Sequence, residues 1–129
     1  MSVESTHLLN KLAFEVHSRK FTVNSDVVEK LGGDDSAPDP HQYLEIALAS
    51  CTAITVMMYA KRKGIPLDDI NVSIHITAEG EVNAISRGVQ LIGNLTLEQK
   101  DSLIAIAEKC PIHKFISRGA QITTILKEA

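Results

Sequence analysis

The residues of this sequence with the greatest capacity for covalent chemistry are its two cysteines, Cys51 and Cys110. Cys51 lies midway along the stretch 46–60, which contains no charged residue, and Leu48 and Ile54 lie three positions away on either side. Burial on such an apolar helical face raises the pKa of a thiol, so reactivity would require a cation, a hydrogen bond or an opening to solvent from another part of the fold. Cys51 is therefore either a small core residue, which the stretch itself favours, or a reactive thiol.

Cys110 has a different context, because it ends one predicted helix and precedes Pro111. Proline suits the first position of a new helical turn, so Cys110 is expected at the N-terminus of a short following turn. The backbone amides of that turn would favour a thiolate, whereas the carbonyl end of the preceding helix would oppose it. The direction of the pKa shift at Cys110 stays open at this point.

Cys110 and His113 also have the Cys-x-x-His spacing of half a metal site. A structural zinc site needs a second closely spaced pair of ligands, and the sequence has none, so no metal is expected. The sequence also has no glycine-rich phosphate loop and no Gly-x-Ser-x-Gly nucleophile elbow. The other histidines are dispersed and are interpreted as surface or strand residues: His7, His17, His41 and His75.

The composition is that of one soluble domain. The chain has 129 residues, 44% of them hydrophobic and 22% charged, which predicts a single domain over residues 1–129. Its net charge of -3 gives no basic footprint for nucleic acid, and Lys61, Arg62 and Lys63 form a short run at a helix end. The N-terminus lacks a signal-peptide pattern, and the 15 residues of 46–60 fall short of the roughly 20 that span a bilayer. We therefore expect a cytoplasmic protein with no membrane partner, in which any disulfide is transient.

The pattern of apolar residues predicts an α+β domain with the order β-β-α-β-β-α-β and a mostly antiparallel sheet. A hairpin is expected first, over 8–18 and 20–26 with a turn at Ser18 and Arg19, and a loop follows. Thr96 and Gln99 form a capping-box pattern at the start of the second helix. The remaining predicted elements are helix 41–63, strands 69–80 and 84–94, helix 96–110 and a last strand over 120–128.

The long helix has no polar face to turn toward water. A surface helix carries an apolar stripe and a polar back, but residues 46–60 have no charge on any side. One small sheet covers one side of such a helix. We infer that a second copy of the chain covers the other side, so that the long helix lies at the centre of a homodimer.

Two segments resemble the signatures of a known family. Residues 38–67, PDPHQYLEIALASCTAITVMMYAKRKGIPL, resemble the Ala-Cys-Thr central helix of OsmC/Ohr-type proteins. Residues 97–117, LEQKDSLIAIAEKCPIHKFIS, are similar to the second signature of that family, which ends in Cys-Pro-Val-His-Lys. The resemblance covers residues 38–128, extends loosely to the N-terminal hairpin, and is closest to the less characterised OsmC-like branch.

This resemblance implies an intertwined homodimer with a long buried central helix and two active sites at the subunit interface. It implies that Cys51 and Cys110 meet in space. Cys51 would reduce an organic, lipid-like hydroperoxide and become a sulfenic acid, and Cys110 would condense with it to a disulfide. A small or protein dithiol would then reduce the disulfide without a metal or flavin, as part of oxidative stress defence.

The sequence departs from the family pattern at one place. Well-known members carry a glutamate near the start of the helix that orients an N-terminal arginine over the reactive sulfur, whereas this chain has His41 and Gln42 there. Arg19, Gln42 or Glu45 are the candidates to replace that pair. Without such a cation Cys51 loses its expected activation.

Two other functions follow from the same residues. The chain is alternatively a non-catalytic dimer that senses redox state or binds a small apolar ligand. A third possibility is a structural domain with inert thiols. Turnover with excess hydroperoxide and dithiol distinguishes the peroxidase from both.

Overall fold

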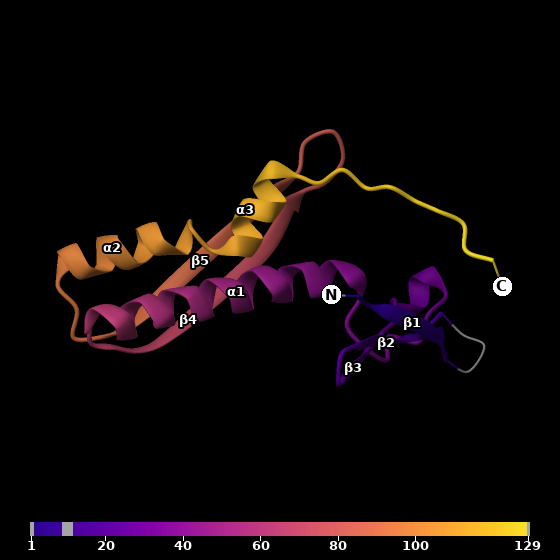
Figure 1. The fold of residues 1–129 in the computed structure, drawn as a ribbon, viewed down its shortest axis with the longest axis horizontal. Coiled ribbons are helices and arrows are strands. Elements are labelled where there is room, and N and C mark those ends of the chain that lie inside the picture. Colours follow the sequence, from indigo (N-terminus) through magenta and orange to yellow (C-terminus); the bar gives the residue numbers. More distant parts are fainter. Residues whose placement is uncertain (1, 9–11, 129) are drawn as a thin grey trace. The chain divides into compact units, whose positions relative to one another are not determined.

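The structure is a computed structural model that describes residues 2–8 and 12–128 (Figure 1). The chain divides into two compact units, Met1–Ile46 and Ala47–Ala129, and helix α1 (Pro40–Lys63) runs from the first into the second. Strands pair antiparallel in both units, which confirms the α+β class and the antiparallel pairing. The single domain over 1–129 stays a prediction.

The first unit contains a three-stranded antiparallel sheet of β1 (Glu4–His7), β2 (Phe14–Ser18) and β3 (Phe21–Ser25), followed by the short helix η1 (Glu29–Leu31). The predicted hairpin is confirmed, with Val16 opposite Val23 and a turn at Arg19 and Lys20. The first predicted strand is shorter than expected, and its residues 9–11 lie outside the described residues. Strand β1 was not predicted, because its four residues have no apolar alternation.

The loop between η1 and α1 closes around one carboxylate. Asp26 is buried, and its side chain accepts hydrogen bonds from the amides of Val27, Asp34 and Ser36 and from the Ser36 hydroxyl at 2.6 Å. The Ser36 hydroxyl first, and the Val27 amide next, lower the pKa of Asp26 to about 2. Gly33 is required in this loop, because a Cβ there would lie 2.1 Å from the Val27 carbonyl oxygen.

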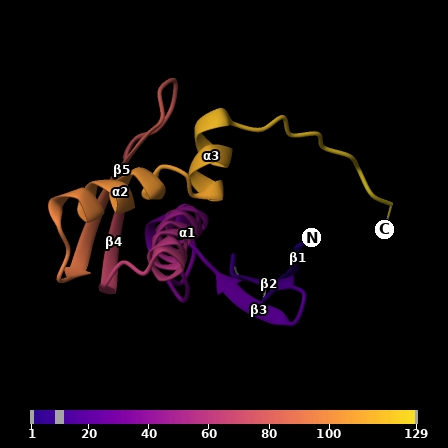
Figure 2. The same ribbon diagram turned by 60° about the vertical axis from the view of Figure 1, so that its left-hand side comes forward.

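The second unit combines an antiparallel hairpin with helices. Strands β4 (Leu67–Ala78) and β5 (Ala84–Gly93) pair with Val72 opposite Val89, and α2 (Leu97–Ala107) and α3 (Pro111–Arg118) follow. Figures 1 and 2 show the second half of α1 and α2 lying beside this hairpin. The shared core joins α1, β4 and α2 and consists of Val56, Ala60, Leu67, Leu103 and Ala107.

Local sequence signals account for the helix boundaries. The backbone amide of Gln42 donates to Asp39 Oδ1, and the Gln42 side chain accepts from the Asp39 amide, so α1 starts one residue before the prediction. Gly64 takes a left-handed conformation, with φ of 67°, after the last residue of α1. The capping box predicted for Thr96 and Gln99 is present at the start of α2.

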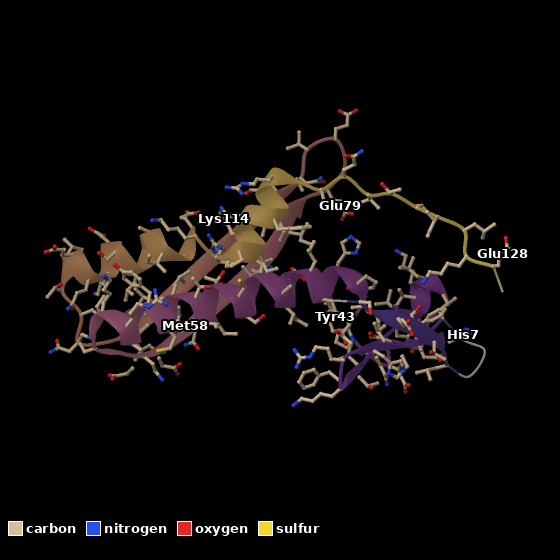
Figure 3. All side chains as sticks on the ribbon, viewed as in Figure 1. His7, Tyr43, Met58, Glu79, Lys114 and Glu128 are labelled. Carbon is tan, nitrogen blue, oxygen red and sulfur yellow. The ribbon has the colours of Figure 1, made fainter. Side chains whose placement is uncertain are left out.

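Only one face of α1 is covered by the rest of the described chain. Its buried residues in the second unit, Leu48, Thr52, Val56 and Ala60, recur every four positions. On another face Ile54 is 59% exposed and Met58 is 55% exposed, and Met58 projects away from α2 (Figure 3). The described chain therefore leaves apolar surface that the predicted second copy would cover.

By length and composition α1 is the one helix of the described residues that could cross a membrane, although the core helix of a soluble protein meets the same test. Its second half contributes Val56 and Ala60 to the core, and the Arg87 side chain reaches Thr52 midway along it. These contacts place one face of α1 against the core of the second unit.

The predicted last strand is wrong. Residues 119–128 follow α3 without forming a strand, and their apolar side chains Ile122, Ile125 and Leu126 are exposed. A β-branched sequence forms a strand only where an edge and an apolar face are available to it. No described strand pairs with this segment.

Candidate functional site

The second unit brings its two cysteines together. Cys51 lies on α1, Cys110 is the N-cap of α3, and the two side chains are close enough for each thiol to shift the pKa of the other. Both are free thiols, Cys51 half-buried and Cys110 fully buried. Their contact makes them a candidate redox pair, and their catalytic roles stay predictions.

Cys110 is surrounded by hydrogen-bond donors. Burial raises the pKa of the Cys110 thiol, but hydrogen bonds from Cys51, the His113 amide, the Thr52 hydroxyl and the Ile112 amide outweigh it, so the pKa is lowered. The His113 amide lies 3.3 Å from Cys110 Sγ. Of the two opposing effects that the sequence left open, the amides at the start of α3 prevail.

Cys51 has the opposite shift. Burial raises the pKa of the Cys51 thiol, and the hydrogen bond that it gives to Cys110 raises it further, because the donated proton is held between the two sulfurs. The Ile112 amide and the Thr55 hydroxyl, whose Oγ1 lies 3.9 Å from Cys51 Sγ, act in the opposite direction, but the pKa of Cys51 is still raised. The two shifts therefore favour the proton on Cys51 and the negative charge on Cys110 when the pair loses its first proton.

A polar network lies against the pair from the β5 side. Arg87 Nη1 donates to Thr52 Oγ1 at 3.2 Å, and Arg87 Nη2 donates to Glu108 Oε2 at 3.3 Å and to His113 Nδ1 at 3.0 Å. His113 Nε2 faces the same Glu108 oxygen at 3.4 Å. Because a guanidinium has only donors, His113 Nδ1 accepts, and its ring proton lies on Nε2 toward Glu108.

Three residues of this network were not predicted from the sequence: Arg87, Thr52 and Glu108. A signal for Arg87 was present, because it falls in phase with Ile85, Val89 and Leu91 on the half-buried face of β5. A charged residue at an apolar position of a strand needs a polar partner. The partners come from α1, α3 and the end of α2, which periodicity alone does not bring together.

The other predicted candidates lie in the first unit. Arg19 has a positive φ of 55°, and its guanidinium lies 5.4 Å from the centre of the Phe21 ring. Gln42 is used in the cap of α1, and Glu45 is half-buried on α1. Whether one of them serves Cys51 stays a prediction.

His113, the histidine of the Cys-x-x-His spacing, contacts protein groups rather than forming part of a metal-binding cluster among the described residues. Its ring contacts Arg87 and Glu108, and its amide contacts Cys110. Within residues 2–8 and 12–128, no group of three His, Cys, Asp or Glu side chains could hold a metal ion. The chemistry that this site supports is thiol chemistry.

Fold and site together define a class of small α+β proteins in which a long helix and the start of a shorter one bring two cysteines into contact. The sequence model of the OsmC-like protein family matches residues 33–125, and the chain belongs to this family.

Solved structures share the fold. An OsmC-like protein from Mycoplasma pneumoniae is 13% identical with a TM-score of 0.75, over 90% of this chain and 86% of that one. The organic hydroperoxide resistance protein OsmC from Legionella pneumophila is 23% identical with a TM-score of 0.61, over 88% and 85%. An organic hydroperoxide resistance protein from Elizabethkingia anophelis is 20% identical with a TM-score of 0.65, over 91% and 86%. No curated protein matches the chain.

Proposed function

We propose that this protein is a thiol-dependent peroxidase that reduces organic hydroperoxides as part of oxidative stress defence. The observation that carries the proposal is the contact between a half-buried Cys51 and a buried, hydrogen-bonded Cys110. Family membership and the organic hydroperoxide resistance proteins among the structural neighbours support the substrate class.

The first step oxidises Cys51. Its proton passes to the Cys110 sulfur as its own sulfur attacks the distal oxygen of the hydroperoxide. The O–O bond breaks, the departing alkoxide takes up a proton as alcohol, and Cys51 is left as a sulfenic acid. Cys51 takes this role because it is half-buried, whereas Cys110 is fully buried.

The second step joins the two sulfurs. Cys110 attacks the Cys51 sulfur, the S–O bond breaks, and the hydroxyl leaves as water with one proton. A small or protein dithiol then attacks the disulfide and leaves as its own disulfide, which restores both thiols. These steps use two electrons per hydroperoxide and no metal or flavin.

The protein acts as a cytoplasmic homodimer in this proposal. The exposed apolar side chains of α1, including Ile54 and Met58, supply a surface for the second copy. An apolar interface beside Cys51 suits a lipid-like hydroperoxide better than hydrogen peroxide.

One observation favours a second candidate, a redox-sensing or ligand-binding dimer without turnover. The raised pKa of Cys51 lowers the fraction of its reactive thiolate. In that case oxidation of the pair is slow and serves as a signal.

Steady-state consumption of cumene hydroperoxide and of hydrogen peroxide with excess dithiothreitol tests the proposal. The expected result is turnover that requires both cysteines and prefers the organic peroxide. Consumption no faster than with free dithiothreitol alone would refute the peroxidase and leave the sensor.

A further inference from the structure

Arg87 is a cation on the apolar side of its strand. Its side chain is 12% exposed, and it lies in phase with Ile85 and Val89. Removing a guanidinium from water is costly unless every donor finds a good acceptor. Glu108 supplies one acceptor, but its side chain is 63% exposed and reachable from the surface, so it does not by itself explain why Arg87 points inward.

The inward partner of Arg87 is the Thr52 hydroxyl. That hydroxyl is fully buried and has a single proton, for which the Leu48 carbonyl oxygen at 2.7 Å and the Cys110 sulfur are both acceptors. A guanidinium that donates to the hydroxyl oxygen polarises the O–H bond and makes it a stronger donor. Arg87 therefore strengthens the hydrogen bond that the Thr52 hydroxyl gives to Cys110 when its single proton turns from the Leu48 carbonyl oxygen to the sulfur.

The second inward partner is the His113 ring. Arg87 Nη2 donates to His113 Nδ1 at 3.0 Å, while the backbone amide of the same residue lies 3.3 Å from Cys110 Sγ. The ring contact therefore ties the first turn of α3 to β5, with its amide directed at the sulfur. The titratable or charged groups that face Cys110 directly or through these contacts are Cys51 from α1, Arg87 from β5, Glu108 after α2 and His113 from α3.

We propose that Arg87 is the positioning residue of the cysteine pair: through Thr52 and His113 it holds the negative charge on Cys110 and so makes Cys110 the proton acceptor for Cys51. The family pattern has an N-terminal arginine over the reactive sulfur, whereas Arg87 comes from strand β5 and acts on the Cys110 side of the pair. The placement of the charge is independent of substrate, whereas its use in catalysis rests on the proposed function.

The test is a spectroscopic titration that needs no peroxide. In a Cys51→Ser background, which keeps a hydroxyl donor beside the remaining thiol, the thiolate absorbance near 240 nm is followed against pH. Arg87→Gln is expected to move the midpoint upward by roughly one pH unit, because it removes the cation and weakens the Thr52 donor. Arg87→Lys keeps the positive charge but loses the planar guanidinium that donates to two partners at once. Its midpoint is expected to lie between those of the protein with Arg87 and the Arg87→Gln variant.

Two further variants keep the result interpretable. Arg118→Gln removes an exposed arginine from the last turn of α3 and is expected to leave the midpoint unchanged. Thr52→Val removes the hydroxyl without removing the buried charge, and it is expected to raise the midpoint even if Arg87→Gln does not fold. An unchanged midpoint in folded Arg87→Gln, or in Thr52→Val if the arginine variant unfolds, would overturn the inference.

The same set separates this inference from the proposed function. A raised midpoint together with no peroxide consumption by the native protein would retain the role of Arg87 and remove the peroxidase. Peroxide consumption by the native protein together with an unchanged midpoint in the Arg87 variant would retain the peroxidase and remove the role of Arg87.

Discussion

The two cysteines have the same side chain and touch each other, yet their surroundings differ in what the backbone offers. Cys51 lies in the middle of α1, where the amides of its own helix are already engaged in helical hydrogen bonds. Cys110 is the N-cap of α3, where the first amides of a helix have no carbonyl partner. The pKa of Cys110 is therefore lowered by hydrogen bonds, whereas burial raises the pKa of Cys51.

This difference explains how a pair of thiols can divide its tasks. In the proposed function, the half-buried thiol keeps its proton in the resting protein, and its buried neighbour, whose pKa is lowered, accepts that proton during the reaction. Position in a helix, rather than residue type, would then set the two roles.

The largest effect on hydroperoxide turnover is expected when either cysteine of the pair is replaced. Cys51→Ser is expected to reduce hydroperoxide turnover by about 10³-fold, because it removes the attacking sulfur. Cys110→Ser is expected to allow one oxidation of Cys51 to a sulfenic acid, which then cannot form the disulfide. Trapping of the sulfenic acid with dimedone, followed by mass spectrometry, distinguishes the two variants. Trapping on Cys110 in the Cys51→Ser variant would reverse the roles.

The next prediction concerns the proposed dimer interface, which lies on the helix that carries Cys51 and does not involve Cys110. Cys110 is already fully buried within the second unit, whereas Cys51 is half-buried on a helix with an exposed apolar face that includes Ile54. Ile54→Asp is expected to convert a dimer to a monomer in sedimentation velocity, because it places a charge in the proposed interface.

The control for that change is Lys100→Asp, which alters an exposed side chain of α2. It is expected to sediment like the native protein. A native protein that sediments as a monomer at micromolar concentration would contradict the proposed interface.

A smaller effect compares the hydroxyls beside the two sulfurs. Thr52→Val is expected to cost about 1–3 kcal/mol of stability, because it leaves a donor of the buried Arg87 without an acceptor. Thr55→Val removes only a weak contact at 3.9 Å from Cys51 Sγ and is expected to change stability by less than about 0.5 kcal/mol. Urea unfolding of both variants makes the measurement, and equal losses would show that Thr52 has no special partner.

The smallest effect is on the pH dependence of unfolding. A lowered folded-state pKa at Cys110 contributes stability that is present above its unfolded pKa and is lost as pH falls through the folded value. A raised pKa at Cys51 contributes stability that is present below its unfolded pKa and is lost as pH rises through the folded value.

The single variants Cys51→Ser and Cys110→Ser each keep one of these thiols. The double variant keeps neither, and its pH dependence of unfolding is the reference for both single variants. Urea midpoints measured from neutral to alkaline pH are expected to rise relative to the reference when only Cys110 is kept. They are expected to fall when only Cys51 is kept. Slopes of the same sign would contradict the division of charge.

The sequence predicted those parts of the fold that local signals specify. The start of α2 at Thr96 and the end of α1 before Gly64 follow from caps whose chemistry lies within a few residues. The segment 120–128 could not be predicted this way, because a strand needs an edge supplied from elsewhere.

The site was predictable to a similar extent. The resemblance implied that Cys51 and Cys110 meet, and the second unit brings them into contact. The direction of the Cys110 shift and the part of Arg87 were not predictable, because they depend on how β5, α1 and α3 meet in three dimensions.

The most direct test of the central claim, that Cys51 and Cys110 act as one redox unit, is a single oxidation of the reduced protein. One equivalent of cumene hydroperoxide is added, the reaction is stopped with an alkylating agent after a few seconds, and peptides are mapped without reduction. The account predicts a disulfide between Cys51 and Cys110, absent from either serine variant. Thiols that stay reduced, or that oxidise no faster than free cysteine, would contradict it.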